Sequence, residues 1–389
     1  MQNVPGRPTA TRAPPGAALN PLVSVCVPAY ERHVFLDQLI SSVVHQTYSP
    51  IELCIRDDSR SDSVEHVVES WRRDFFPIAI NYRRNSDRLG FQRNLEAVLR
   101  ESTGDITVVL GDDDMFATPG ALAAYVAAAE RHPGAAFLYP NLIQIDEQCN
   151  RTAVHRYFRA QTYYAAGADS LAGPWLRSVQ IAGMGFCVPA TMVAGLLPTV
   201  PSLFPQVAAV GQLLLTHGSV GMNDYLVATR VTGSQLGYEV AQGRSVFGDR
   251  QRLGGVELLE ILAEMRSRAP TVLEPVKAGL ERRIFVGFLL SEPNIRVFSG
   301  RRALARLARS YATHSWQARR SPVFWMVTVG LWVAPVWYVR LAIAILKIGA
   351  RRLRKVDAVP FVAPPHSRTS WLDADLDRGQ RGCAGPLRQ

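Results

Sequence analysis

The sequence predicts an α/β fold in which a mainly parallel sheet carries helices on both faces. Short apolar runs alternate with segments of helical periodicity from residue 22 to residue 146. Repeated β-α-β units of this size require a parallel sheet with right-handed crossovers. Acidic residues also follow several of the apolar runs, and ligands of such sheets bind beyond the carboxyl ends of the strands. The residues at these ends are therefore the first candidates for function.

The expected strands are the apolar runs, and the expected helices lie between them. The runs span residues 22–30, 51–59, 78–85, 105–114 and 134–146. Helical periodicity covers 35–46, 62–75 and 90–100, and Pro119 occupies a favoured first-turn position for a further helix. Two more apolar helices are expected at 205–216 and 255–265, within a region rich in Gly, Pro and aromatic residues that is suited to loops around a pocket.

Charge is distributed unevenly along the chain. The formal net charge is +10, and the segment from Glu281 to Lys355 contains fifteen Lys or Arg and two Glu. This basic segment also contains the longest apolar run, which favours an anionic membrane surface as partner over nucleic acid. No nucleic-acid-binding motif accompanies it. The five cysteines are scattered without CxxC spacing, which suggests neither a zinc site nor a disulfide framework and fits a reducing compartment.

The apolar run in this segment predicts membrane attachment without a simple span. No charged residue lies between Pro322 and Val339, a length close to that of a bilayer span. However, Pro335 interrupts the run, and Arg or Lys clusters flank both ends. A single span would export one cluster, against the positive-inside tendency. Two half-helices in a re-entrant or in-plane anchor fit better, and a buried core helix is the alternative.

These patterns give a division of the chain. We expect a disordered leader at 1–20, an α/β domain at 21–245, a helical region at 246–320, an apolar and basic membrane-associated segment at 321–355 and a disordered tail at 356–389. The expected location is the cytoplasmic face of the cell membrane.

Three consecutive carboxylates, Asp112, Asp113 and Asp114, follow the apolar run ITVVLG. Asp is common in turns, which is the plain alternative for any one of them. Three in succession repel each other and need a cation or basic neighbours. Mg²⁺ or Mn²⁺ binds through one or two carboxylates while phosphate oxygens and water complete its shell, and it neutralises a departing diphosphate. Asp112 and Asp114 are the predicted metal-binding pair.

Four motifs in order resemble family 2 glycosyltransferases, which have the GT-A fold. They are VSVCVPAYERHVFLDQLISSVVHQTY, IELCIRDDSRSD, NSDRLGFQRN and GDITVVLGDDDMFATPGAL. The form LGDDD is similar to that of O-antigen sugar transferases of the abequosyltransferase type. The resemblance covers about a third of the chain, and Pro119 stands one residue further from the last Asp than in the family pattern, which leaves open which two Asp form the working pair.

The resemblance implies that 21–245 is a GT-A glycosyltransferase domain, in which 21–146 binds the nucleotide and 147–245 the acceptor. It also implies roles for individual residues. Asp58 would bind the base of a nucleoside-diphosphate sugar, and Arg93 would approach its diphosphate. The backbone of Pro28, Ala29 and Tyr30 would line the base pocket. Asp112 and Asp113 would face the ribose and phosphates, and Asp114 would ligate the metal.

The family inverts configuration at the anomeric carbon and needs a base for the acceptor hydroxyl. The family's usual acidic motif for that base is absent here, and Asp224 and Glu239 are the candidates in the right region, with surface positions as their alternative. The QxxRW motif of processive synthases is also absent from the sequence.

The predicted function is that of a metal-dependent inverting glycosyltransferase that moves a sugar from a nucleoside-diphosphate sugar to a lipid-linked or cell-envelope glycan acceptor. A sugar-phosphate nucleotidyltransferase shares the sheet and the metal, but its glycine-rich segment after the first strand is replaced here by PAYERH. A non-catalytic membrane scaffold with the same fold is the third alternative.

Overall fold

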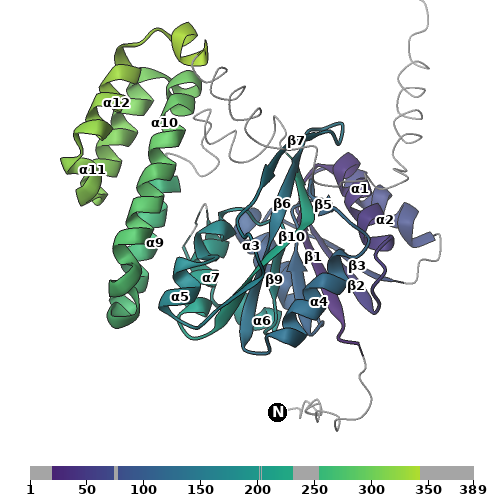
Figure 1. The fold of residues 1–389 in the computed structure, drawn as a ribbon. Coiled ribbons are helices and arrows are strands. Elements are labelled where there is room, and N and C mark those ends of the chain that lie inside the picture. Colours follow the sequence, from purple (N-terminus) through teal and green to yellow (C-terminus); the bar gives the residue numbers. More distant parts are fainter. Residues whose placement is uncertain (1–19, 74–77, 201, 203, 231–253, 342–389) are drawn as a thin grey trace, which may run out of the picture.

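A computed structural model describes residues 20–73, 78–200, 202, 204–230 and 254–341 (Figure 1). The strands are β1 (Val23–Ala29), β2 (Ile51–Asp57), β3 (Ala79–Arg84), β4 (Ile106–Val109), β5 (Met115–Phe116), β6 (Ala135–Ile145), β7 (Arg151–His155), β8 (Thr162–Tyr164), β9 (Met184–Phe186) and β10 (Gly218–Arg230). The helices of the same region are α1 (His33–Val44), α2 (Ser63–Arg73), α3 (Phe91–Glu101), α4 (Ala121–Arg131), α5 (Ala168–Ala172), the 3₁₀ helix η1 (Trp175–Val179), α6 (Ala190–Gly195) and α7 (Pro205–Leu214).

The predicted α/β fold is confirmed, with a sheet that is mixed. Among the described residues, ten strands form one sheet in the order β3-β2-β1-β4-β9-β6-β10-β5, with β7 beside β6 and β8 beside β10. β1 pairs in parallel with β2 and β4, and β10 pairs in parallel with β6, whereas β9 is antiparallel to both its neighbours. Every residue of β1 is buried, as expected for a strand covered on both faces.

Right-handed crossovers explain how helices cover both faces. The chain moves outward from β1 to β2 to β3 and then returns across the sheet to β4. Since the hand is fixed, the outward and return crossovers lie on opposite faces. α1 and α2 accordingly pack on each other, while α3 packs on β1, β2 and α6. The carboxyl ends of the parallel strands stay open at one edge.

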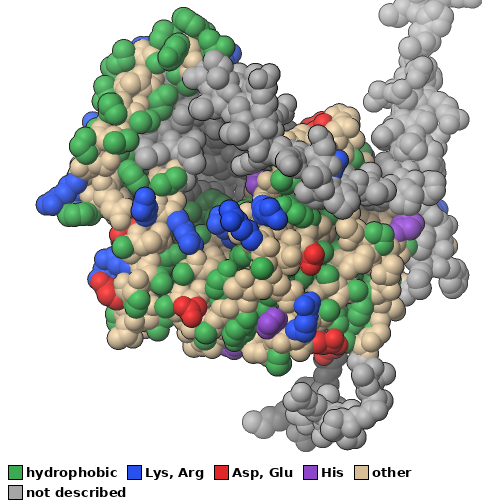
Figure 2. Space-filling view, viewed as in Figure 1, with side chains coloured by type: hydrophobic (Ala, Val, Ile, Leu, Met, Phe, Trp, Pro, Cys, Tyr) green, Lys and Arg blue, Asp and Glu red, His purple; other side chains and the backbone are tan. Residues whose placement is uncertain are grey.

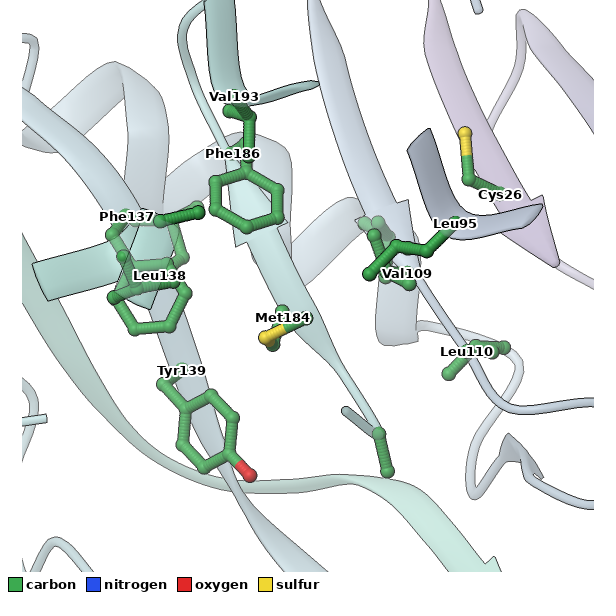
Figure 3. Packing of buried hydrophobic residues seen from close by; sticks show 14 of the residues in the cluster. Cys26, Leu95, Val109, Leu110, Phe137, Leu138, Tyr139, Met184, Phe186 and Val193 are labelled. Carbon is green, nitrogen blue, oxygen red and sulfur yellow. The ribbon is translucent and has the colours of Figure 1, made fainter. Parts of the chain in front are cut away.

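The core lies between the sheet and these helices. Figure 3 shows part of it, where Phe137 of β6 and Phe186 of β9 have ring centroids 5.5 Å apart and Met184 lies between β6 and β4. Phe137, Phe186 and Val109 are at most 1% exposed. This packing fixes β9 between β4 and β6 and so sets the distance between the two halves of the open edge.

The end of the fourth predicted strand differs from the expectation. The apolar pattern predicts a strand over 105–114, but β4 ends at Val109. Asp114 donates its backbone N–H to the Gly111 carbonyl (3.0 Å), which makes a turn, and the chain then pairs as β5 with β10. The three Asp therefore lie in a turn beyond the strand, since Gly and Asp favour turns over strands.

The C-terminal described region is helical and packs beside the sheet domain (Figure 1). It contains α9 (Gly254–Arg268), α10 (Pro270–His314), α11 (Trp316–Arg320) and α12 (Pro322–Val333). α9 contacts α7, α10 contacts α5, and α11 and α12 fold back on α10. The predicted interruption at Pro335 is confirmed, because α12 ends at Val333 and helix resumes at residue 336.

None of the helices described in residues 20–341 combines the length and the apolar character required to cross a bilayer. Several predictions lie outside the described residues: the leader up to residue 19, Glu239, residues 342–355 of the basic segment and the tail at 356–389.

Candidate functional site

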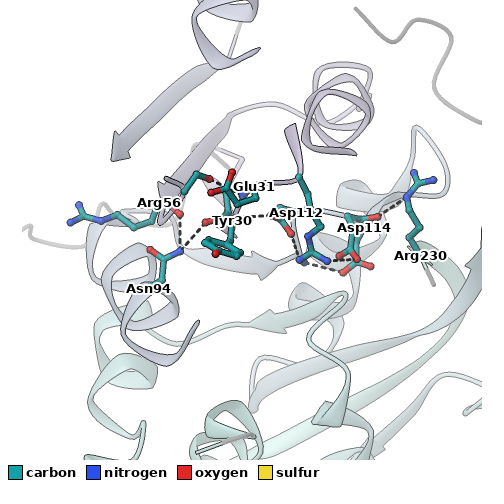
Figure 4. Close-up of polar contacts among 12 residues, drawn as sticks. Tyr30, Glu31, Arg56, Asn94, Asp112, Asp114 and Arg230 are labelled. Atoms are coloured by element: carbon teal, nitrogen blue, oxygen red, sulfur yellow. Dashed lines mark hydrogen bonds and ion pairs between the residues drawn. The ribbon is translucent and has the colours of Figure 1, made fainter. Parts of the chain in front are cut away.

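Two of the sequence-predicted acidic segments meet at the end of β1. β1 lies between β2 and β4 and runs parallel to both. Asp58, just after β2, donates its backbone N–H to the Ala29 carbonyl (3.0 Å). Tyr30, just after β1, donates its backbone N–H to Asp112 Oδ2 (2.7 Å) (Figure 4). The fold therefore brings Asp58 and Asp112 to either side of the same strand end.

The acidic cluster, Asp112 to Asp114, is almost completely enclosed. Its three residues are 0%, 6% and 3% exposed in chain order. Arg32, which precedes α1, forms ion pairs with Asp112 and with Asp113, the latter at 2.5 Å between Nη1 and Oδ2. Asp114 Oδ2 accepts the Gly111 backbone N–H (2.9 Å). Each carboxylate thus has a partner from the chain, and among the described residues Arg32 is the one side chain that forms ion pairs with these carboxylates.

The electrostatics of the cluster favour a further positive charge. Burial is the main reason that the pKa of Asp112 is raised to about 6 and that of Asp114 to about 8. The Asp113 carboxylate raises the pKa of both neighbours further, and the Arg32 guanidinium opposes the rise. Three carboxylates against one guanidinium leave excess negative charge in a dry site.

The oxygen-only donor set of the cluster fits a hard divalent cation. In the part of the chain that the structure describes, no group of three or more His, Cys, Asp or Glu side chains is arranged to hold a metal ion.

Asp58 holds the start of α3. Its Oδ1 accepts the Leu89 backbone N–H (2.7 Å) and an amide hydrogen of Asn85 (2.9 Å), and its Oδ2 accepts the Gly90 backbone N–H (2.8 Å). Gly90 precedes α3 with φ of 76°, a conformation that favours glycine. The base-binding role implied for Asp58 stays a prediction; what the structure adds is that this carboxylate organises the loop beside it.

The other predicted donor-binding residues lie around this loop. The side chains of Pro28 and Ala29 are buried in β1, which leaves only their backbone for a ligand. The guanidinium carbon of Arg88 lies 4.6 Å from the centroid of the Tyr30 ring. Arg93 is exposed on the first turn of α3. Neither Arg88 nor Arg93 forms an ion pair with a described residue, which leaves two positive charges at the start of α3, beside the loop that Asp58 organises.

Three residues that build the site were not singled out from the sequence. Arg32 pairs with the acidic cluster, as described above. Asn94 of α3 donates to the Ala29 and Arg56 carbonyls (3.3 and 2.9 Å) and so ties α3 to the ends of β1 and β2. Arg230, at the end of β10, is fully buried and donates from Nε to the Asp113 carbonyl (3.2 Å).

Arg230 connects the acidic cluster to two other elements. Its Nη1 donates to the Asp146 and Glu147 carbonyls (2.8 and 3.0 Å), and its guanidinium carbon lies 4.4 Å from the centroid of the Phe35 ring on α1. A single side chain therefore fixes the turn that carries Asp113 against the β6–β7 connection and α1 (Figure 4). The only signal in the sequence was a lone Arg after an apolar run.

Of the two base candidates, Asp224 lies among the described residues and is not brought into the cluster. Asp224 is exposed, in the irregular middle of β10. It precedes Arg230 by six residues, which corresponds to about 20 Å of extended strand. No hydrogen bond or ion pair joins Asp224 to the described residues of the cluster. Glu239 lies outside the described residues. The identity of the base stays a prediction on both positions.

The arrangement defines a class before any comparison is made. It is an α/β domain with a buried carboxylate cluster and unpaired arginines at the carboxyl edge of a sheet, which suits a ligand that carries phosphates and a divalent cation. Residues 24–178 match the family described as glycosyl transferase family 2. Over this range the chain is therefore similar to family 2 glycosyltransferases, as the four motifs indicated.

Two curated relatives and one solved structure place this match in context. The chain is 38% identical over 99 residues to the abequosyltransferase RfbV of Salmonella typhimurium, covering 25% of this chain and 29% of that protein. It is 29% identical over 123 residues to the GalNAc(5)-diNAcBac-PP-undecaprenol beta-1,3-glucosyltransferase of Campylobacter jejuni, covering 32% and 38%. The chain thus spans less than two fifths of the length of either relative.

The solved structure supports the fold alone. The S. aureus TarS fragment 1–349 in complex with UDP-GlcNAc superposes with a TM-score of 0.52 at 13% identity, covering 80% of this chain and 89% of that one.

Proposed function

We propose that this chain is a metal-dependent inverting glycosyltransferase that transfers a sugar from a nucleoside-diphosphate sugar to a lipid-linked or cell-envelope glycan acceptor. The observation that carries the proposal is the buried acidic cluster at the carboxyl edge of a family 2 domain, beside Tyr30 and Asp58. A nucleotide sugar supplies both the phosphates and the leaving group that such a cluster, with a cation, would serve.

Asp114 and Asp112 are the residues that would hold Mg²⁺ or Mn²⁺, with Asp113 and Asp112 toward the ribose and phosphates. When bound, the cation would neutralise the charge that develops on the departing diphosphate. Arg32 forms ion pairs with Asp112 and Asp113, and Arg230 holds the Asp113 backbone carbonyl. These two arginines preorganise the carboxylates, so little reorganisation is needed during transfer.

Arg88 and Arg93 contribute on the nucleotide side. Each presents a guanidinium without a carboxylate partner among the described residues, close to the loop that Asp58 organises. Guanidinium groups bind phosphate oxygens through paired hydrogen bonds. We assign them to the donor diphosphate, and the ring of Tyr30, on which Arg88 rests, to the wall of the same pocket.

The acceptor and the location are proposed from the C-terminal helices. α12 and the helix after it expose Val323, Trp325, Met326, Val329, Trp332, Val333, Trp337, Tyr338 and Leu341. Arginines border this apolar surface: the guanidinium carbon of Arg301 lies 5.8 Å from the Trp332 ring centroid, and that of Arg320 lies 4.5 Å from the Trp316 ring centroid. Figure 2 shows the apolar side chains gathered on this part of the molecule.

Tryptophan and arginine together suit the interface of an anionic membrane. We therefore propose that the enzyme works at the cytoplasmic face of the cell membrane. The Campylobacter jejuni relative is named for an undecaprenol diphosphate-linked acceptor, which supports a lipid-linked acceptor for this chain.

The direct test is a screen of nucleoside-diphosphate sugars with and without Mn²⁺. Binding is read as a rise in melting temperature, and turnover is read as release of nucleoside diphosphate. In a parallel assay with a nucleoside triphosphate and a sugar 1-phosphate, release of inorganic pyrophosphate would instead identify a nucleotidyltransferase. A chain that binds no nucleotide sugar and releases no nucleotide under any of these conditions would contradict the proposal.

A further inference from the structure

A second polar cluster lies at the same open edge of the sheet, on the side away from the nucleotide. Val108 of β4 and Leu138 of β6 both pair with Gly185 of β9. Tyr139 therefore lies level with Val109, the residue that ends β4. The Tyr139 hydroxyl donates to the Gln180 carbonyl (3.0 Å), which brings the end of η1 to this level. We call Tyr157, Arg177, Gln180 and Gln206 the Arg177 cluster.

Arg177 is a cation without a carboxylate. Its guanidinium carbon lies 4.9 Å from the centroid of the Tyr157 ring, and that ring is 5.9 Å from the ring of Tyr139. Arg177 forms no ion pair within the described ranges, and the same is true of the exposed Arg156 and Arg159 nearby in the chain. A guanidinium over the face of an aromatic ring still has N–H groups with which it can bind a phosphate in a bidentate manner.

Two buried amide oxygens complete the cluster. Gln206, at the start of α7, is 5% exposed, and its Nε2 donates to the Val179 carbonyl (3.1 Å). Its Oε1 has no hydrogen-bond partner in the described structure, and neither does Oε1 of Gln180. Leaving a buried acceptor unpaired costs stability, so these two oxygens point to a ligand that brings hydrogen-bond donors. The hydroxyl groups of a sugar are such donors.

Strand order places the clusters in a line. The order β2-β1-β4-β9-β6 sets the nucleotide side at β1 and β2, the acidic cluster after β4, and the Arg177 cluster beside β9 and β6. Neighbouring strands are about 4.8 Å apart, so β6 lies roughly 10 Å beyond β4. Burial is the main cause that raises the pKa of Tyr139, and the Asp114 carboxylate adds to the rise. This influence of Asp114 agrees with the two clusters being close neighbours.

The surface between the sheet domain and the C-terminal helices carries positive charge, which matches an anionic ligand. Figure 2 shows Lys and Arg side chains gathered along the border of a hollow between the C-terminal helices and the sheet domain. Arg283 of α10 borders α5, where its Nη1 donates to the Ala172 carbonyl (2.5 Å). The edge of the sheet domain that faces the C-terminal helices is therefore suited to an anionic molecule.

We propose that the Arg177 cluster is the acceptor subsite, in which Arg177 binds a phosphate group of a phosphate-bearing glycan and the amide oxygens of Gln180 and Gln206 accept hydrogen bonds from its sugar hydroxyls. This inference rests on the proposed glycosyl transfer, and it names the acceptor as an anionic glycan. The sugar of the donor would cross the acidic cluster from the β1 side to the β6 side.

The test compares Arg177→Gln with the matched control Arg131→Gln in the full chain. Arg131 is exposed on α4, where it donates to Ala127 O and to Gln161. Each protein is titrated calorimetrically with inorganic phosphate at constant ionic strength, both alone and saturated with a nucleoside diphosphate and Mg²⁺. We expect Arg177→Gln to bind phosphate at least about tenfold more weakly in both states, while Arg131→Gln matches the natural chain.

The two proposals fail separately. Nucleoside diphosphate binding by the natural chain tests the glycosyltransferase proposal, and Arg177→Gln should leave this binding and the melting temperature unchanged. The phosphate affinity of Arg177→Lys should lie between that of Arg177→Gln and that of the natural chain, because Lys keeps the charge but cannot bind phosphate in a bidentate manner. Equal phosphate affinity in Arg177→Gln and the natural chain, or no phosphate binding by the natural chain in either state, would overturn the acceptor subsite.

Discussion

Arg230→Met should destabilise the protein through loss of the hydrogen bonds that hold the acidic turn. The substitution keeps an unbranched apolar side chain but removes donors to the carbonyls of Asp113, Asp146 and Glu147. Each orphaned carbonyl costs about 1 kcal/mol. Loss of the contact with the Phe35 ring adds roughly 1 kcal/mol, and better burial of the Met side chain returns part of the total. We expect a net loss of about 3 kcal/mol in the free energy of unfolding.

The assay is urea unfolding at neutral pH, followed by circular dichroism, with Arg131→Met as the control. The control replaces an exposed arginine, so its free energy of unfolding should change by less than about 0.5 kcal/mol. A loss of 3 kcal/mol corresponds to a melting temperature lower by roughly 6 to 12 °C. An Arg230→Met variant within about 1 kcal/mol of the natural chain would refute the view that Arg230 holds the turn.

Arg32→Met removes the cation that, among the described residues, forms ion pairs with the Asp112 and Asp113 carboxylates. Without metal the melting temperature should fall, while the rise on adding Mn²⁺ should become larger than in the natural chain. An unchanged response to Mn²⁺ would show that the metal binds elsewhere. Replacing Trp325, Trp332 and Trp337 together by Ser should weaken binding to anionic vesicles by about tenfold or more in a sedimentation assay. Tyr163→Ser is the control, because Tyr163 is an exposed aromatic residue of the sheet domain. Vesicle binding by the triple variant equal to that of the natural chain would contradict the assignment of α12 to the membrane surface.

The fold of the first half of the sheet domain could be predicted because its signals are local. β1 and β2 are short runs of apolar residues buried on both faces, and α3 places its apolar residues on one helical face. Each pattern is contained in about ten residues. The position of Asp112 to Asp114 at the open edge followed from strand order alone, because carboxyl ends of parallel strands meet at one edge.

The end of β4 and the whole of β10 were harder to predict from the sequence. The run ITVVLGDDDMF continues in apolar character past the three Asp, but Gly111 and Asp114 close a turn that only tertiary pairing with β10 makes necessary. β10 contains Gly218, Gly221 and Asn223 and is interrupted by register shifts. These residues lower strand propensity, and pairing along β6 overrides them.

The arginines of the site could not be predicted from local patterns. Arg32 reaches Asp113 across 81 residues of sequence, and Arg230 reaches the same residue across 117. Nothing near either arginine in the sequence distinguishes it from an arginine on a solvated face. Their partners are set by the packing of α1 and β10 around the turn, which is a property of the whole sheet.

The most direct test of the account is Mn²⁺-dependent release of nucleoside diphosphate from a nucleotide sugar by Asp114→Ala, with Asp169→Ala as the control. Asp169 lies exposed in the first turn of α5. Asp114→Ala removes a buried carboxylate that burial disfavours, and it also removes the acceptor of the Gly111 N–H. These two effects oppose each other, so the melting temperature should change little. We predict that it loses Mn²⁺-dependent release by about a hundredfold or more, while Asp169→Ala keeps the natural rate. Full Mn²⁺-dependent turnover by Asp114→Ala would contradict the assignment of the acidic cluster as the metal and diphosphate site.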